Sequence, residues 1–143
     1  MKGLDPDNIF SMFNQDDNTI YEQHGMEDML NDVTIQILSV ANNIESYYLM
    51  DQIYTYKKPH EYSKVRKVVK IKYFKKQFKQ LTAIDLHQIS NISYEQIRQD
   101  LPRVLDNLQL MLKVYEGWEQ YECCKVIRTY IESLVLIQLH SMI

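Results

Sequence analysis

The sequence predicts an all-α protein, a bundle of four to five helices preceded by an N-terminal arm. Two observations support this fold class. The 143 residues include only three glycines and three prolines, which are too few for the many turns of a strand-rich fold. In addition, apolar residues recur at spacings of three and four over long stretches, which is the pattern of amphipathic helices. We expect the arm at residues 1–25 and one helical bundle domain at residues 26–143.

The arm combines large apolar side chains with acids. Asp5 followed by Pro6 has the form of an N-cap and a first helical residue, which predicts a short helix over residues 6–13. Such a segment can dock as an amphipathic helix in an apolar groove of a partner, or it can pack on its own domain or on a second copy. The residues that we interpret as partner-binding are Ile9, Phe10, Met12 and Phe13.

The first long helix is predicted over residues 27–56. Its apolar residues follow one stripe at spacings of three and four: Leu30, Val33, Ile37, Val40, Ala41, Ile44, Tyr47 and Tyr48. Glu27 and Asp28 favour a helix start at this point, because acids in a first turn interact favourably with the helix dipole.

The next segment, residues 57–79, holds ten of the sixteen basic residues and a single acid, Glu61. A helix over residues 61–80 would turn its apolar face near Lys70, so that its two halves contact different surfaces. A strand through Val69, Ile71 and Tyr73 is the alternative, because these residues alternate with lysines. We favour the helix, since a lone strand would have no partner.

The basic segment is also a candidate anion-binding surface. Its positive side chains could meet a phosphate backbone, and Tyr62, Tyr73 and Phe74 are interleaved with them as stacking on single-stranded bases would require. The alternative is a solvated helix that meets the acidic segments of the same chain. The candidate phosphate contacts are Lys64, Arg66, Lys67, Lys70, Lys72, Lys75, Lys76 and Lys79.

Further helices are predicted in the second half. Thr82 with Asp85 predicts a cap for a short helix over residues 83–90, and Ser93 predicts the start of another. An apolar stripe then runs over residues 94–115, where Pro102 either lies in the first turn of a new helix or bends one long helix.

The last predicted helix covers residues 118–142 and has apolar residues around more than half of its circumference. Such a distribution indicates burial on several sides. We expect its apolar end to be covered by the rest of the domain or by another chain. The residues assigned to this interface are Leu134, Leu136, Leu139 and Ile143.

The sequence carries no catalytic signature. The four histidines are scattered, the adjacent Cys123 and Cys124 suit neither a disulfide framework nor a zinc site, and there is no glycine-rich phosphate loop. We therefore expect no catalytic residues, no metal, no cofactor and no small-molecule substrate. No membrane span or secretory leader is indicated, which predicts a location in the cytoplasm or nucleus.

These features favour a non-enzymatic protein–protein interaction or assembly module, such as a small subunit or adaptor, with a protein partner or a second copy of itself. The alternative is a nucleic-acid-binding protein that makes sequence-independent phosphate contacts through the lysine-rich helix.

Overall fold

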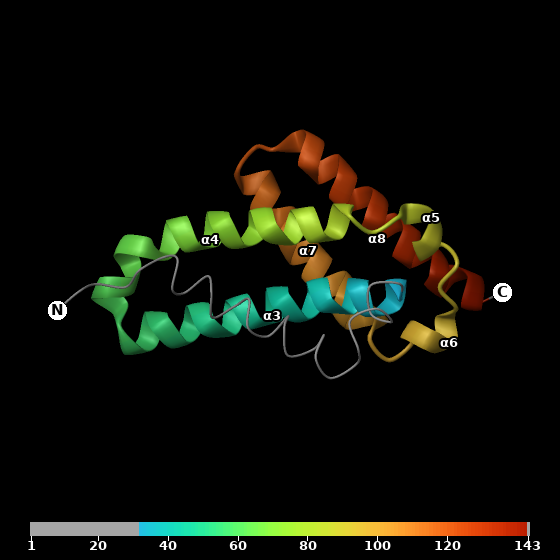
Figure 1. Cartoon of the computed structure of the whole chain (residues 1–143), viewed down its shortest axis with the longest axis horizontal. Coiled ribbons are helices and arrows are strands. Elements are labelled where there is room, and N and C mark those ends of the chain that lie inside the picture. The colour runs from blue at the N-terminus through green and yellow to red at the C-terminus, as the bar shows by residue number, and fades with distance from the viewer. Residues whose placement is uncertain (1–31, 143) are drawn as a thin grey trace.

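The computed structural model describes residues 32–142, which form α-helices joined by short turns (Figure 1). This confirms the predicted all-α class. The favoured helix over the basic segment is confirmed, and the alternative strand through Val69, Ile71 and Tyr73 is wrong, because these residues lie within a helix. The predicted arm at residues 1–25 lies outside the described residues. The helices are α3 (Val33–Lys57), α4 (Pro59–Thr82), α5 (Leu86–Ile89), α6 (Tyr94–Ile97), α7 (Leu101–Gly117) and α8 (Tyr121–Ser141).

Helices α3 and α4 form an antiparallel hairpin and pack along their length (Figure 1). The carboxylate of Asp32 accepts a hydrogen bond from the Thr34 amide at 2.9 Å and caps α3, so the helix begins at Val33 and not at the predicted residue 27. The hairpin turns at Lys58. Pro59 then occupies the first turn of α4, where a missing N–H costs nothing.

Helix α4 is continuous, and its two halves have different neighbours. In the first half, the ring of Tyr62 lies 5.5 Å from that of Tyr54 on α3. In the second half, Tyr73 stacks on Tyr47 of α3 at 5.2 Å, while Phe78 on the adjoining face lies 5.3 Å from a ring on α7. Both halves of α4 therefore pack on α3, and the second half also contacts α7. The prediction that the two halves contact different surfaces holds only for this added contact.

The connection from α4 to α7 uses polar caps. Asp85 accepts a hydrogen bond from the His87 amide at 2.9 Å and caps α5. Thr82 does not share in this cap, contrary to the prediction, because its hydroxyl donates back to carbonyls of α4. The Ser93 amide donates to Gln96 at the start of α6. Helix α7 begins at Leu101 with Pro102 in its first turn, which confirms the first of the two alternatives for this proline.

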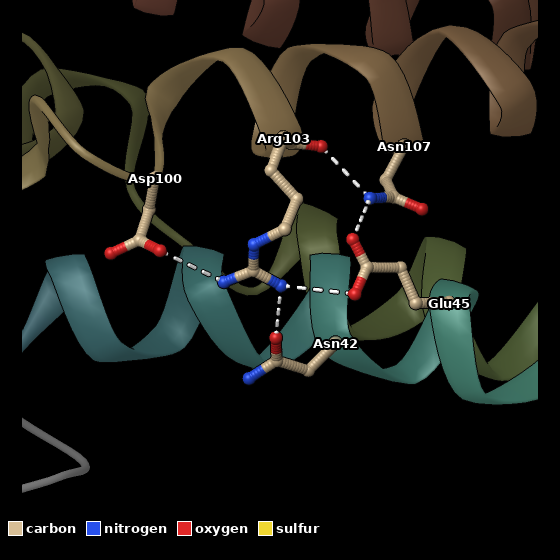
Figure 2. Close-up of polar contacts among 5 residues, drawn as sticks. All are labelled: Asn42, Glu45, Asp100, Arg103 and Asn107. Carbon is tan, nitrogen blue, oxygen red and sulfur yellow. Dashed lines mark hydrogen bonds and ion pairs between the residues drawn. The ribbon is translucent and has the colours of Figure 1, made fainter.

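Helix α7 packs between α3 and α8 and is tied to α3 by polar side chains (Figure 2). The guanidinium of Arg103 donates to Asn42, to Glu45 at 3.2 Å and to Asp100 at 3.1 Å. Asn107 donates to the other oxygen of Glu45 at 2.9 Å. Because the charged groups of Arg103, Glu45 and Asp100 are only partly buried, they fix the alignment of two helices without leaving an unpaired charge in the core.

The core lies between the α3–α4 hairpin and the packed pair of helices α7 and α8, and it includes several tyrosines. Four buried tyrosines donate hydrogen bonds to acceptors elsewhere in the chain: Tyr62 to Asp51, Tyr73 to the Asn43 carbonyl, Tyr115 to the Phe74 carbonyl and Tyr130 to the Ile84 carbonyl. Buried hydroxyls without such partners would destabilise the fold. Within residues 32–142, no helix combines the length and the hydropathy that crossing a membrane requires.

Candidate functional site

Four lysines form an unpaired row on α4. Lys64, Lys67, Lys75 and Lys79 are exposed, and none forms a hydrogen bond or an ion pair within residues 32–142. Their spacing places them on one side of the helix, over about 22 Å of its axis. We call these four residues the lysine row.

The other predicted anion contacts differ from the lysine row. Lys72 is exposed, whereas Lys70 and Lys76 are half-buried. Arg66 is bound to Asp51 of α3 through two hydrogen bonds, of 2.9 and 2.8 Å, so its guanidinium is already paired with a carboxylate of the same chain, and about half of its side chain is exposed. Its guanidinium joins the two helices of the hairpin.

Asp51 is the centre of this joint, with 6% of its surface exposed. Its carboxylate also accepts a hydrogen bond from the hydroxyl of Tyr62 at 2.7 Å. Burial alone would raise the pKa of Asp51, but the hydrogen bonds from Arg66 and Tyr62 outweigh burial and hold that pKa below its ordinary value. A structural charge pair therefore accounts for the perturbed carboxyl.

The aromatic residues of the basic segment are not available for base stacking. Tyr62, Tyr73 and Phe74 are fully buried in the core of the chain. Stacking on nucleic-acid bases requires an exposed ring face. The interleaving of aromatic and basic residues along the sequence therefore reflects the two sides of one helix, with rings inward and lysines outward.

Beside the lysine row lies a groove between α4 and the turn that joins α7 to α8. It has a volume of about 430 Å³. We call it the Trp118 groove, and its lining residues are Lys67, Ile71, Lys75, Phe78, Tyr115, Trp118, Gln120 and Cys123. A second hollow of about 440 Å³ adjoins it, shares Lys67 and Trp118, and reaches Lys70 and the Asp51–Arg66 pair.

Aromatic rings hold the wall of the Trp118 groove in place. The ring of Tyr115 lies 5.2 Å from that of Trp118 and 5.3 Å from that of Phe78. The Tyr115 hydroxyl donates to the Phe74 carbonyl at 3.0 Å, so this tyrosine offers the groove its ring and not its hydroxyl. Tyr115 belongs to the buried core, and Phe78 and Trp118 pack against that core, so the wall is held by close packing.

The turn after α7 sets the position of Trp118. The Trp118 amide donates to the Val114 carbonyl at 3.1 Å and closes the end of α7. The next residue, Glu119, has a φ of 58°, a left-handed conformation that reverses the chain toward α8. This reversal leaves the indole beside α4, where it lines both hollows.

A third surface is the end of α8. Leu136, Leu139 and Met142 are 51%, 49% and 77% exposed, at successive spacings of three residues. Leu134, which was assigned to the same interface, is fully buried in the chain's own core and cannot contact a partner. We call Leu136, Leu139 and Met142 the α8 strip. Ile143 lies outside the described residues, as do the arm residues Ile9, Phe10, Met12 and Phe13.

Sequence patterns identified the lysines of the Trp118 groove but not its wall. Tyr115 ends the predicted apolar stripe over residues 94–115 and Trp118 begins the last predicted helix, and nothing in their spacing relates them to α4. Within residues 32–142, no three histidine, cysteine, aspartate or glutamate side chains gather closely enough to hold a metal ion. Comparisons with protein-family models, curated proteins and solved structures find no match for this chain.

Proposed function

We propose that this protein is a non-enzymatic assembly module, a small subunit or adaptor that binds another protein chain. The observation that carries the proposal is the α8 strip. Leu136 and Leu139 on the last turns of α8, with Met142 at its C-cap, are about half or more exposed, and a cluster of exposed apolar side chains is typical of protein contact sites. Their burial by a partner would remove this apolar area from water and stabilise the complex.

The polar groups of the described chain support a structural role. Asp51 and Arg66 pair across α3 and α4, and Arg103 joins α7 to α3, so contacts that hold helices together account for these polar groups. Cys123 and Cys124 are free thiols, which suits a reducing intracellular compartment. The arm residues Ile9, Phe10, Met12 and Phe13, with Ile143, extend the proposed partner contacts beyond the described residues.

The test places a photocrosslinking amino acid at Leu139, inside the α8 strip, or at Leu49 of α3, which is also exposed but lies on another helix. We expect crosslinks to another protein chain from position 139 in native cells and not from position 49. Equal or absent crosslinking at the two positions would reject the proposal. Light scattering of the purified chain then distinguishes a second copy from a different partner.

A second candidate function is sequence-independent binding of nucleic acid through the lysine row. The observation that favours it is that all four lysines are exposed and unpaired within the described residues. Lysine ammoniums meet phosphates as point charges, without reading bases. Binding of a fluorescent single strand should weaken as salt rises, and charge reversal at Lys64 and Lys79 should lower the salt slope by about two. Salt-independent binding would exclude this function.

A further inference from the structure

We propose that the Trp118 groove binds a free single-chain anionic amphiphile, a long-chain carboxylate, with its apolar chain on the aromatic wall and its carboxylate at Lys67 and Lys75. This inference is independent of the assembly function, because it concerns a different surface from the α8 strip. The sequence indicated no small-molecule ligand. The groove becomes evident only where α4 meets the turn between α7 and α8.

The size and the lining of the groove fit such a ligand. Its volume of about 430 Å³ lies in the range of sites that enclose small molecules. Ile71, Phe78, Tyr115 and Trp118 offer apolar surface, and the hydroxyl of Tyr115 is already engaged by the Phe74 carbonyl. An aliphatic chain needs no hydrogen-bond partner, so this wall suits it better than it suits a polar metabolite.

The charge of the groove selects an anion. No carboxylate lines it, whereas Lys67 and Lys75 do, and neither ammonium forms an ion pair within residues 32–142. Asp51, the one carboxylate that lines the adjoining hollow, is already neutralised by Arg66. A ligand carboxylate would therefore meet positive charge that the described chain leaves uncompensated.

The positions of the two lysines match an amphiphile. Lys67 and Lys75 lie four residues on either side of Ile71, so all three share one side of α4. The Cα atoms of the two lysines are about 12 Å apart along the helix axis. Lysine stems can lie along apolar surface while their ammoniums reach the rim. This arrangement surrounds an apolar floor with two flexible cations, each able to form a charge-assisted hydrogen bond to a carboxylate.

Trp118 supplies the reporter, because it is the only tryptophan of the chain. Decanoate, below its critical micelle concentration, is titrated into the full-length protein while tryptophan fluorescence and heat are recorded. We expect saturable binding of decanoate, with binding of decanol and of decyltrimethylammonium at least about tenfold weaker, because neither replaces the charge-assisted hydrogen bonds. Decanoate should also slow the alkylation of Cys123, which lines the same groove.

Matched variants locate the site. Lys67→Glu with Lys75→Glu should weaken decanoate binding by about tenfold or more, whereas Lys64→Glu with Lys79→Glu changes the same net charge outside the groove lining and should leave it within about twofold. Circular dichroism establishes that each variant is folded. If the reversal of charge at positions 67 and 75 prevents folding, Lys67→Gln with Lys75→Gln replaces it, and the same loss is expected.

Four outcomes would overturn the proposal. Equal binding of decanoate and decanol would show an apolar surface without anion selectivity, and equal losses in the two lysine pairs would show diffuse charge attraction. Binding to vesicles of anionic phospholipid without binding of decanoate would assign the surface to membranes. The absence of any saturable change in the fluorescence or heat would leave the groove without this ligand.

Discussion

The joint between α3 and α4 gives the sharpest test of how this fold is stabilised. Asp51→Ala removes a carboxylate that accepts hydrogen bonds from Arg66 at 2.8 and 2.9 Å and from Tyr62 at 2.7 Å. Arg66 is half exposed and regains water, but the Tyr62 hydroxyl stays buried without an acceptor, a loss worth about 1–3 kcal/mol. The charge-assisted hydrogen bonds from Arg66 are lost as well, so we expect the free energy of unfolding to fall by about 3 kcal/mol in total.

The effect should depend on pH with a definite sign. The pKa of Asp51 is lower in the folded chain than in the unfolded chain, so between the two values the unfolded state binds more protons. The contribution of the carboxylate is therefore fully present above about pH 4, the ordinary aspartate pKa, and is lost as the pH falls through the folded value. Urea unfolding at several pH values should show the difference between native chain and variant shrinking below about pH 4.

A second substitution separates the two partners of Asp51. Tyr62→Phe removes the hydroxyl and leaves the bonds from Arg66, so it should cost about 1 kcal/mol. In the double variant with Asp51→Ala the cost should be less than the sum of the single costs, because phenylalanine needs no acceptor. Strict additivity, or a loss below about 1 kcal/mol for Asp51→Ala at neutral pH, would refute this account of the joint.

Further experiments test the turn at Glu119, the contacts of Arg103 between α7 and α3, and the burial of the two thiols. Glu119→Gly should raise the free energy of unfolding by about 1 kcal/mol, because glycine adopts the left-handed conformation without strain; no gain in urea unfolding would contradict this. Arg103→Met should lower the free energy of unfolding by about 1–2 kcal/mol. Arg128→Met, which breaks a single exposed ion pair, should change it by less than about 0.5 kcal/mol. Equal effects of the two substitutions would contradict the proposed contribution of the Arg103 contacts to stability. In the folded chain, Cys123 should react with a thiol reagent and Cys124 should not, because Cys124 is fully buried; two equally fast thiols would contradict the packing of α8.

The helices were predictable because their apolar residues repeat at the helical period, and this repeat survives whatever tertiary contacts form. The predicted start of α3 was wrong for a local reason. Asp32 has the short carboxylate of an N-cap and takes that role, although Glu27 and Asp28 also carry the charge that a first turn favours. Likewise, Thr82 and Asp85 had the spacing of a shared cap, but the threonine hydroxyl found carbonyls of its own helix.

The candidate sites were only partly predictable, because burial is a tertiary property. Leu134 and Leu136 are both leucines near the end of one helix, yet the first is fully buried and the second is half exposed. Arg66 has the charge of its lysine neighbours, but its planar guanidinium makes the paired bonds to Asp51 that a lysine could not. The sequence supplied the candidates, and the arrangement of helices selected among them.

One stripe of α4 nevertheless encodes where the Trp118 groove lies. Lys67, Phe74 and Leu81 follow one another at intervals of seven residues and so share nearly the same side of the helix. Phe74 and Leu81 are fully buried, whereas Lys67 is exposed. A buried unpaired lysine would be strongly destabilising. The part of the protein that covers this side of α4 at Phe74 and Leu81 must therefore end before Lys67. Trp118 contacts Phe74 at that edge, at 6.4 Å between ring centres, and the groove extends from there beside the uncovered lysines.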